Sequence, residues 1–553
     1  MMKIHDIGSK MASLMLLLAI TSSLWAQFEP YVGPQDAAGD PNNTRESYLT
    51  GNQVSMLFKN TSEISGWPAA NAHMWPTGLD ALKMTDGIAL LVGARVYIEN
   101  TGAIDTIPVT DSLIIQSDTS LHVLHYLQTS YREEMDTDIY GMVRYGFFPS
   151  SGYFNEDEEY AAMSNMPSSW PAEGWPSTEG PIGAHQWYGR AGINTINADV
   201  ETYFVINDAQ DQEYLGPEDQ VRYYPRPGLA IGDLGENSTQ VGAPWGGLGI
   251  RVAVRGYQWN SLLFRDIVFW EYELANISDY RLPEIIVGHW IDMGIGGDGE
   301  DDLGYSSESL EMTYSWDMNG VGSGGMPTGS VGVAYLGDSA LSRIATSRLF
   351  PVASHSPNNS TRWFKNDGVM WDLMNTVAYE DAMNSINFIE VIATEKIELP
   401  QNRQISVNLG ILHAYELLEG LNSATHDAPN LIALKGLAQQ VVLNDYHTEG
   451  ITGIEDDPEK PYDYGLMQNY PNPFNPSTTI RYSLPEVSDV SLIIYDMKGR
   501  VVQSYSERSQ AAGWVNYEWS GTNMSGEPIS TGVYLCRLEA GKYTRTIKMV
   551  YLK

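Results

Sequence analysis

Hydrophobic and polar residues alternate in many short stretches of this chain, which is the pattern of half-buried β-strands. The clearest stretches are residues 200–206 and 250–255. A longer one, residues 262–274, is apolar at its even positions except at Asp266. We expect one continuous strand there, with Arg251 or Arg255 of a neighbouring strand paired with that carboxylate. Further strands are predicted at residues 54–59, 88–99, 112–116, 121–129, 139–148, 331–336 and 387–394.

A helical period appears near the end of this β-rich region. Within residues 428–446, Leu431, Leu434, Ala438 and Val441 recur at helical spacing, so we expect a helix whose apolar stripe packs on a core. The chain is therefore predicted to be mostly β. It should contain one or two sandwich-like domains that end in this helix, followed by a separate β-rich module at the C-terminus.

The first 26 residues have the three parts of a secretory signal peptide, in the usual order. Lys3 and Lys10 precede an apolar run at residues 11–20, and a polar end leads to Ala26, after which we expect cleavage. A bilayer needs about twenty apolar residues, so this run is too short to span one. No later stretch is long enough either, and we expect a mature chain that is soluble or anchored by other means.

The length of 553 residues predicts about three folded units. We divide the chain into a signal peptide (1–26), an N-terminal β-rich region (27–197), a second β-rich domain (198–447), a linker (448–465) and a C-terminal module (466–553). Residues 27–447 are called the passenger below.

Charge separates the passenger from the rest of the chain. The net charge of the chain is −37. The first 27 residues carry +1 and the C-terminal module carries +2, so the region between them carries −40. Such a field repels phosphate backbones and attracts divalent cations, so nucleic-acid binding is disfavoured. Cys536 has no second cysteine to pair with, and we expect a small buried hydrophobe there.

The C-terminal module opens on a proline-rich segment, residues 469–480, that fits neither a helix nor a central strand. Strands alternating with Gly-rich and Pro-rich turns follow, including a hairpin turn between Asp496 and Gly499. A loop block at 519–534 and a basic end at 548–553 complete the module. Several short strands at this spacing favour an immunoglobulin-like sandwich.

These features, in this order, resemble the type A sorting domain of cargo of the type IX (Por) secretion system, and the related Ig-like module of flagellar hook-capping proteins. The resemblance covers residues 469–553. It rests on Pro471, Asn472, Pro473, Phe474, Asn475, Pro476, Asp496, Gly499, Arg500, Gly532 and Tyr534.

The resemblance implies that outer-membrane secretion machinery binds the module. It further implies that the module is removed and that the passenger is fixed to surface lipopolysaccharide, or released, outside a Gram-negative bacterium. The alternative is an ordinary terminal Ig-like domain without an export role.

Within the passenger, the most suggestive chemistry is a glycine-rich acidic loop that follows a buried strand. Calcium prefers several carboxylate and carbonyl oxygens on a flexible loop. Candidate ligands are Asp292, Asp298, Glu300, Asp301 and Asp302. The spacing matches no EF-hand, and a solvated acidic turn is the alternative. This segment also resembles a block in uncharacterised surface proteins that carry the same C-terminal module.

Three indoles occur close together in a long loop. Trp170, Trp175 and Trp187 could stack on sugar rings, which would give a glycan-binding site. The alternative is that their rings plug one end of a sandwich, with the polar edge in water.

Motifs of serine hydrolases, zinc proteases and phosphate-binding loops are absent from the sequence. Paired carboxylates for glycoside hydrolysis are a matter of spacing in three dimensions, which the sequence leaves open. The hypothesis is a secreted surface protein that is not an enzyme, with a structural, adhesive or glycan-binding passenger. The alternative is a secreted carbohydrate-active hydrolase.

Overall fold

The structure is a computed structural model. It describes residues 28–552 except 67, 70, 79–80, 100–113, 116–120, 131–145, 210–222, 225–246, 279–280, 298–300, 352–366, 381–386, 452–463, 467–468, 470–471, 486 and 542. The predicted signal peptide and most of the predicted linker and of the predicted strand 139–148 lie outside the described residues. None of the helices within these described ranges has the length and hydropathy to cross a membrane.

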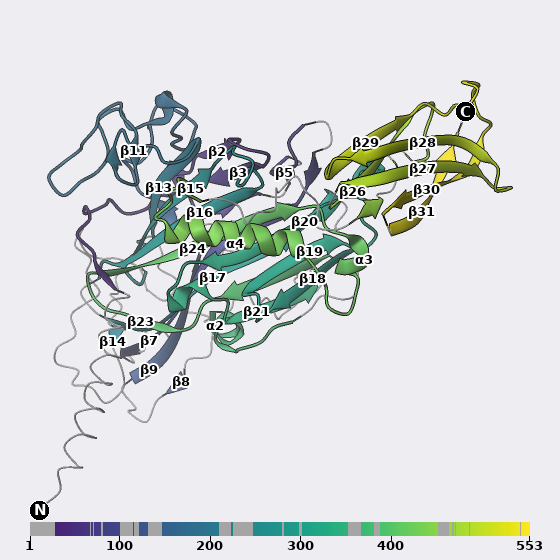
Figure 1. Cartoon of the computed structure of the whole chain (residues 1–553). Coiled ribbons are helices and arrows are strands. Elements are labelled where there is room, and N and C mark those ends of the chain that lie inside the picture. The colour runs from purple at the N-terminus through teal and green to yellow at the C-terminus, as the bar shows by residue number, and fades with distance from the viewer. Residues whose placement is uncertain are drawn as a thin grey trace, which may run out of the picture.

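Two large antiparallel sheets form the passenger (Figure 1). In the described part of the chain, nine strands make sheet A: β10 (Phe148–Pro149), β13 (Val200–Asn207), β15 (Ile250–Gln258), β16 (Ile267–Asn276), β24 (Arg403–Ala414), β20 (Ser330–Leu336), β19 (Met312–Asp317) and β18 (Asp302–Ser307), with β1 (Glu29–Pro30) beside β24.

Thirteen strands make sheet B within the same described ranges. Its main path runs β21 (Thr346–Pro351), β22 (Phe388–Ala393), β17 (Leu282–Met293), β7 (Thr85–Glu99), β4 (Glu63–Ile64), β3 (Ser55–Lys59), β5 (His73–Trp75) and β6 (Leu82–Lys83). The remaining strands are β2 (Glu46–Leu49), β8 (Ile114–Ile115), β9 (Leu121–Thr129), β14 (Tyr223–Tyr224) and β23 (Ile397–Leu399).

The two sheets share one core. Leu90 of β7 and Val287 of β17 in sheet B belong to the same buried cluster as Val252, Trp270 and Ile411 of sheet A. Strand β7 also pairs with β17 along most of its length, although the two lie on opposite sides of residue 197. The predicted boundary at 197/198 therefore runs through a single sandwich, because the two passenger regions complete each other's sheets.

Helices cover the outer faces of the sandwich. Helix α4 (Pro429–Leu443) lies on sheet A (Figure 1), with the predicted stripe Leu431, Leu434, Ala438 and Val441 buried. Proline suits the first helical turn, where no amide donor is needed. Helix α2 (Asp367–Asn375) packs on β7, β17 and β22 of sheet B, and the short α3 (Leu418–Leu421) precedes α4.

The long strand expected at 262–274 is shorter than predicted. Strand β16 starts at Ile267, and Asp266 lies in the preceding turn, where its carboxylate accepts a hydrogen bond from Trp75 Nε1 at 2.7 Å. The expected pairing of Asp266 with Arg251 or Arg255 is wrong, since both arginines are engaged elsewhere on sheet A. The predicted apolar face is confirmed within β16, where Trp270 and Tyr272 point into the core. It is wrong for Leu262, which is 54% exposed, and Phe264 belongs to a different buried cluster.

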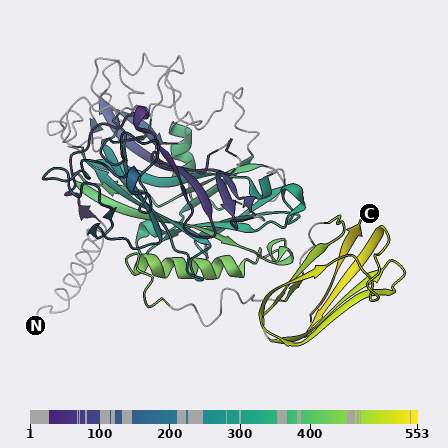
Figure 2. The same ribbon diagram turned by 90° about the horizontal axis from the view of Figure 1, so that it is seen from above.

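The C-terminal module has its own core. Its sheets are β25 (Gly465–Leu466), β26 (Thr478–Leu484) and β29 (Gly513–Trp519), and β28 (Val501–Gln510), β27 (Ser488–Asp496), β30 (Gly532–Ala540) and β31 (Tyr543–Tyr551). Every residue of its buried cluster falls between 466 and 551, including the buried Cys536. Figure 2 shows the module as a separate body beside the passenger. The prediction of a mostly β chain built from sandwiches is confirmed.

Candidate functional site

The motif residues of the C-terminal module meet at one end of its sandwich. Three strands, β26, β28 and β30, start at this end, and three others, β27, β29 and β31, finish at it. The strand pairing shows this, because the first residues of one strand pair with the last residues of its neighbour: Thr478 with Trp519, Tyr534 with Asp496, and Gly532 with Tyr551. We call this end the signature end. It gathers segments that lie up to eighty residues apart in the sequence.

The proline-rich opening closes the signature end. Phe474 is buried against Trp519 and Tyr551, with ring centroids 5.3 and 5.1 Å away. Its amide donates to the carbonyl of Val550 at 2.9 Å, and Asn472 Oδ1 accepts from the amide of Val550 at 2.7 Å. The side chains of Pro473, Asn475 and Pro476 are exposed, whereas Pro471 lies outside the described residues.

The turn from Asp496 to Arg500 is built by one carboxylate. Asp496 Oδ1 accepts the amides of Lys498 and Arg500, each at 2.9 Å, and Oδ2 accepts Arg500 Nε at 2.7 Å. Gly499 has φ +77°, which favours glycine. Tyr534 donates its hydroxyl hydrogen to the carbonyl of Ser530 at 2.6 Å, in the manner of the tyrosine corner of Ig-like domains.

Three of the five acidic candidates lie in the part of the structure that is described: Asp292 on β17, Asp301 just before β18 and Asp302 at its start. Asp298 and Glu300 lie outside it. Asp301 bonds Asn319 Nδ2, and Asp302 Oδ2 accepts the amide of Ile295 at 3.1 Å. Within the described ranges, no group of three or more His, Cys, Asp or Glu side chains is placed to hold a metal ion.

Two of the three indoles, Trp175 and Trp187, lie inside the passenger rather than on its surface. Trp175 and Trp187 are 0% and 1% exposed and pack at 5.5 Å between ring centroids, while Trp170 is half-buried. Trp187 Nε1 donates to Glu201 at 3.0 Å, and Trp175 Nε1 to the carbonyl of Gln186 at 2.7 Å. Sugar rings cannot reach the two buried faces in this conformation, which supports the alternative reading of plugging rings.

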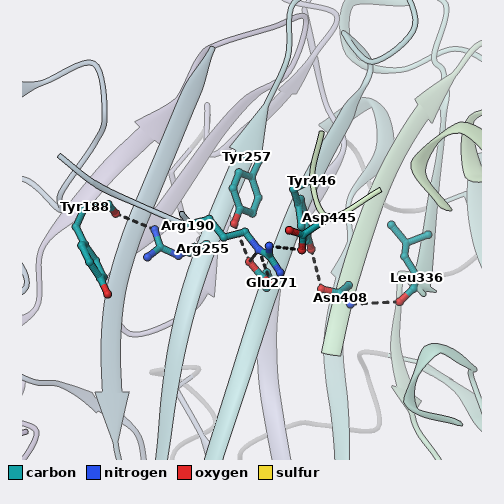
Figure 3. A network of polar contacts seen from close by, with 9 residues as sticks. All are labelled: Tyr188, Arg190, Arg255, Tyr257, Glu271, Leu336, Asn408, Asp445 and Tyr446. Carbon is teal, nitrogen blue, oxygen red and sulfur yellow. Dashed lines mark hydrogen bonds and ion pairs between the residues drawn. The ribbon is translucent and has the colours of Figure 1, made fainter. Parts of the chain in front are cut away.

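A buried polar network covers part of the outer face of sheet A (Figure 3). Arg190 binds Glu271 at 3.0 Å and also pairs with Asp445. Tyr257 donates to the same Glu271 at 2.7 Å, and Arg255 donates to the carbonyl of Tyr188 at 2.9 Å. Strands β15 and β16 point these charged side chains outward because alternate positions fill the core.

The network links segments that lie over sheet A to the strands beneath them. Arg190 comes from the loop after β11 (Tyr188–Gly189), which turns into β12 (Gly192–Ile193), and Asp445 follows helix α4. Nearby, Arg251 pairs with Asp36 from the N-terminal segment and donates to Tyr153 at 3.2 Å. Each arginine faces a carboxylate or carbonyl, so these contacts suit a structural role.

A cavity of about 440 Å³ lies between the passenger and the C-terminal module. Its walls are the loop after β19, the segment from Tyr415 to Leu421, and the outward faces of β26 and β29. The Arg481 guanidinium lies over the Tyr415 ring at 4.8 Å and over the Trp514 ring at 4.5 Å. This stack joins the two bodies.

Buried carboxylates line the passenger side of the cavity. Asp317 Oδ1 accepts three backbone amides, and burial raises the pKa of Asp317 to about 6. Glu416 accepts the amide of Leu431 at 2.7 Å, at the start of α4, and burial raises its pKa to about 8. Both residues can therefore hold a proton near neutral pH.

Sequence reasoning missed this cavity, although one signal was available. Trp514 lies on the outward, polar face of β29. Asn516 and Glu518 lie on the same face, two and four residues further along the strand. A tryptophan on the polar side of a strand indicates a contact surface. The partner Tyr415 carries no such signal, because it follows the end of β24.

Comparisons with known proteins bear on the module more than on the passenger. The module matches the FlgD Ig-like domain over residues 475–544. None of the curated proteins compared with the chain matches it. The structure of FlgD from P. aeruginosa is 30% identical over 13% of this chain and 58% of that chain, with a TM-score of 0.11.

Two further solved structures span most of the chain at low similarity. Dimeric latent PorU from Porphyromonas gingivalis is 11% identical over 95% of this chain and 34% of that one, with a TM-score of 0.17. PorZ, a surface component of the type-IX secretion system of the same organism, is 10% identical over 94% and 60%, with a TM-score of 0.14. This chain spans less than two thirds of each of the three, and their TM-scores are too low to carry an argument about fold.

Proposed function

We propose that the chain is a secreted protein whose C-terminal module directs it through a type IX secretion system to the outer surface of a Gram-negative cell. The observation that carries the proposal is the convergence of the motif residues at the signature end. Only Phe474 and Tyr534 of the described motif residues are buried, and Asn475, Pro476 and Arg500 are exposed.

The arrangement suits recognition by a partner. An ordinary terminal domain needs the buried ring of Phe474 and the turn that Gly499 and the Asp496–Arg500 pair build, but it does not need Asn475 or Pro476 at the surface. Exposed side chains that are gathered from distant segments onto one end form a surface that secretion machinery can read. The buried cluster of the module lies within residues 466–551, which supports folding of the module without the passenger.

Deletion of residues 466–553 tests the proposal in a bacterium that has the secretion system. We expect the full chain on the cell surface or in the medium, and the shortened chain retained in the periplasm. Protease added to intact cells, followed by detection of the passenger, distinguishes the two locations. Equal surface exposure of both chains would overturn the export proposal.

For the passenger we propose a structural, adhesive or glycan-binding role without turnover. Support comes from two buried carboxylates on the outer side of sheet A. Glu271 of β16 and Asp36 of the N-terminal segment are each paired with an arginine rather than left facing solvent. Incubation of the mature chain with a panel of polysaccharides should show retention without release of reducing ends. Turnover that a single carboxylate substitution abolishes would favour a hydrolase.

A further inference from the structure

Two tyrosines of the passenger, Tyr48 and Tyr160, leave their rings in water. Tyr48 is 41% and Tyr160 is 47% exposed. All other tryptophan, tyrosine and phenylalanine side chains whose exposure the structure describes are buried or half-buried. Because an aromatic ring buries a large apolar area when it packs, two rings left in water indicate a contact surface.

The two tyrosines are neighbours on one face of the fold. Tyr48 is an outward residue of β2, in which Glu46 and Tyr48 are exposed while Ser47 and Leu49 are buried. On the edge of β2 that faces away from β3, Tyr160 forms a parallel bridge with Glu46. Bridge partners point to the same face of a sheet, so Tyr160 is the diagonal neighbour of Tyr48, at about 7–8 Å between their Cα atoms. We call Tyr48, Tyr160 and Glu46 the tyrosine platform.

The segments that carry the platform are fixed to each other beneath it. Ser47 Oγ donates to the carbonyl of Ala161 at 3.1 Å from the buried side of β2. Arg45 Nε donates to the carbonyl of Glu158 at 2.7 Å, and its guanidinium lies 4.9 Å from the centroid of the Phe154 ring. The edge of β2 is thus already occupied at this point. A partner cannot add a strand there and has to contact the side chains.

The groups around the rings define the chemistry of the ligand. The exposed Glu46 carboxylate makes no hydrogen bond or ion pair within the described part of the chain, so it is available to accept hydroxyl hydrogens. Lys59, opposite Glu46 on β3, is bound to Glu63 at 2.8 Å. Three further exposed carboxylates come just before Tyr160: Glu156, Asp157 and Glu159. Their negative field repels uronate, sulfate and phosphate groups, which leaves a ligand with flat C–H faces, hydroxyl groups and no negative charge.

We propose that the tyrosine platform binds a neutral polysaccharide, with one sugar ring packed on Tyr48, another on Tyr160, and a sugar hydroxyl donating to Glu46. The inference rests on the proposed glycan-binding role of the passenger and gives that role a site. All three residues belong to the passenger, so the site stays complete after removal of the C-terminal module.

The test measures binding of the mature chain to immobilised polymers by biolayer interferometry. Amylose, mixed-linkage β-glucan and glucomannan are the neutral probes, alginate is the anionic probe and poly-lysine the cationic one. We expect saturable binding to at least one neutral probe, with little change between low and high salt because no ion pair is involved.

Tyr48→Ala and Tyr160→Ala should each weaken this binding about tenfold, since each removes a stacking ring. Tyr48→Phe and Tyr160→Phe keep the rings and should bind nearly as the parent does. Glu46→Gln keeps a hydrogen-bond acceptor without the charge and should also retain binding to the neutral probe. Val377→Ala is the control for loss of an exposed apolar side chain, because Val377 is 76% exposed in the segment after α2.

Thermal unfolding checks that the variants are folded, which we expect at these exposed positions. Parent affinity in the folded double variant Tyr48→Ala/Tyr160→Ala would overturn the platform and leave the glycan-binding role with its site elsewhere. Failure to bind any neutral probe would remove both the platform and the glycan-binding role. Binding to poly-lysine that is lost with added salt and in Glu46→Gln would assign the surface to a basic partner instead, and preference for alginate would refute the charge argument.

Discussion

The passenger and the C-terminal module are both β-sandwiches, but they place their charged side chains in different positions. The passenger buries Arg251 with Asp36 and Glu271 with Arg190, and it buries Glu390 between its sheets. In the described part of the module no charged side chain is buried. The stability of the passenger therefore depends on ion pairs and on pH. The module is stabilised by apolar packing, and its charged side chains lie at the surface, where a partner can contact them.

The largest expected effect is in the passenger, on its buried ion pair. Asp36→Ala leaves the Arg251 charge buried beside Tyr153, and loss of one partner of a buried pair costs about 3–5 kcal/mol in the free energy of unfolding. Urea denaturation followed by fluorescence measures the change. Asp445→Ala is the control, because Asp445 is largely exposed and its loss should cost less than about 1 kcal/mol.

A comparable effect is expected in the module from a core ring. Phe474→Ala removes the ring that packs on Trp519 and Tyr551, and such truncations cost about 3–5 kcal/mol. Calorimetry should show a lower unfolding temperature for the module and an unchanged one for the passenger. A shift of both transitions together would mean that the two bodies do not unfold separately.

An intermediate effect concerns pH and should be confined to the passenger. Burial raises the pKa of Glu390 to about 7 from its ordinary value of 4.5. Between these values the folded chain keeps a proton that the unfolded chain releases, so stability falls as pH rises, by up to about 1.4 kcal/mol per pH unit. Glu390→Gln should be the less pH-dependent chain when unfolding temperatures are compared from about pH 5 to about pH 8.

Buried histidines act in the opposite direction. Burial lowers the pKa of His289 to about 3 and of His413 to about 4, so stability is lost as pH falls from about 6.5 toward those values. Both chains of the Glu390 comparison share these histidines, and the difference between the chains isolates the carboxylate. Identical pH profiles of the parent and Glu390→Gln would contradict the assignment.

The smallest expected effect is at a turn of the signature end. Gly499→Ala places a side chain at φ +77° and should cost about 1 kcal/mol through backbone strain alone, since open space surrounds the position. Gly532→Ala is the matched control: an added Cβ meets only the carbonyl oxygen of Ser530 at 3.9 Å. Equal losses in the two variants, measured by urea denaturation, would contradict this explanation.

Local patterns were sufficient to predict the β-rich fold and helix α4. Alternation predicted residues 200–206 close to β13, and the stripe from Leu431 to Val441 is buried as expected. The pairing of β7 with β17 could not be predicted, because the residue pattern of a strand does not indicate which strand, about 190 residues away, will pair with it. The same limit explains why one sandwich was divided at residue 197.

The candidate sites show where sequence patterns stop being informative. The turn between Asp496 and Gly499 was predicted because its hydrogen bonds are local. The burial of Trp175 and Trp187 depends on packing against Tyr203, which is separate in sequence and invisible to a reading of the loop. The cavity needs Tyr415 and Trp514 to meet across two bodies, and only the three-dimensional structure places them together.

The central claim, that the signature end is the surface read during export, is tested most directly by two substitutions in the full chain. Arg500→Glu reverses an exposed charge at the signature end, and Val487→Glu adds one at the opposite end, beside the start of β27. Surface exposure of the passenger, measured by protease accessibility on intact cells, should fall sharply for Arg500→Glu and stay at the parent level for Val487→Glu. Equal export of both variants, with both modules folded, would contradict the claim.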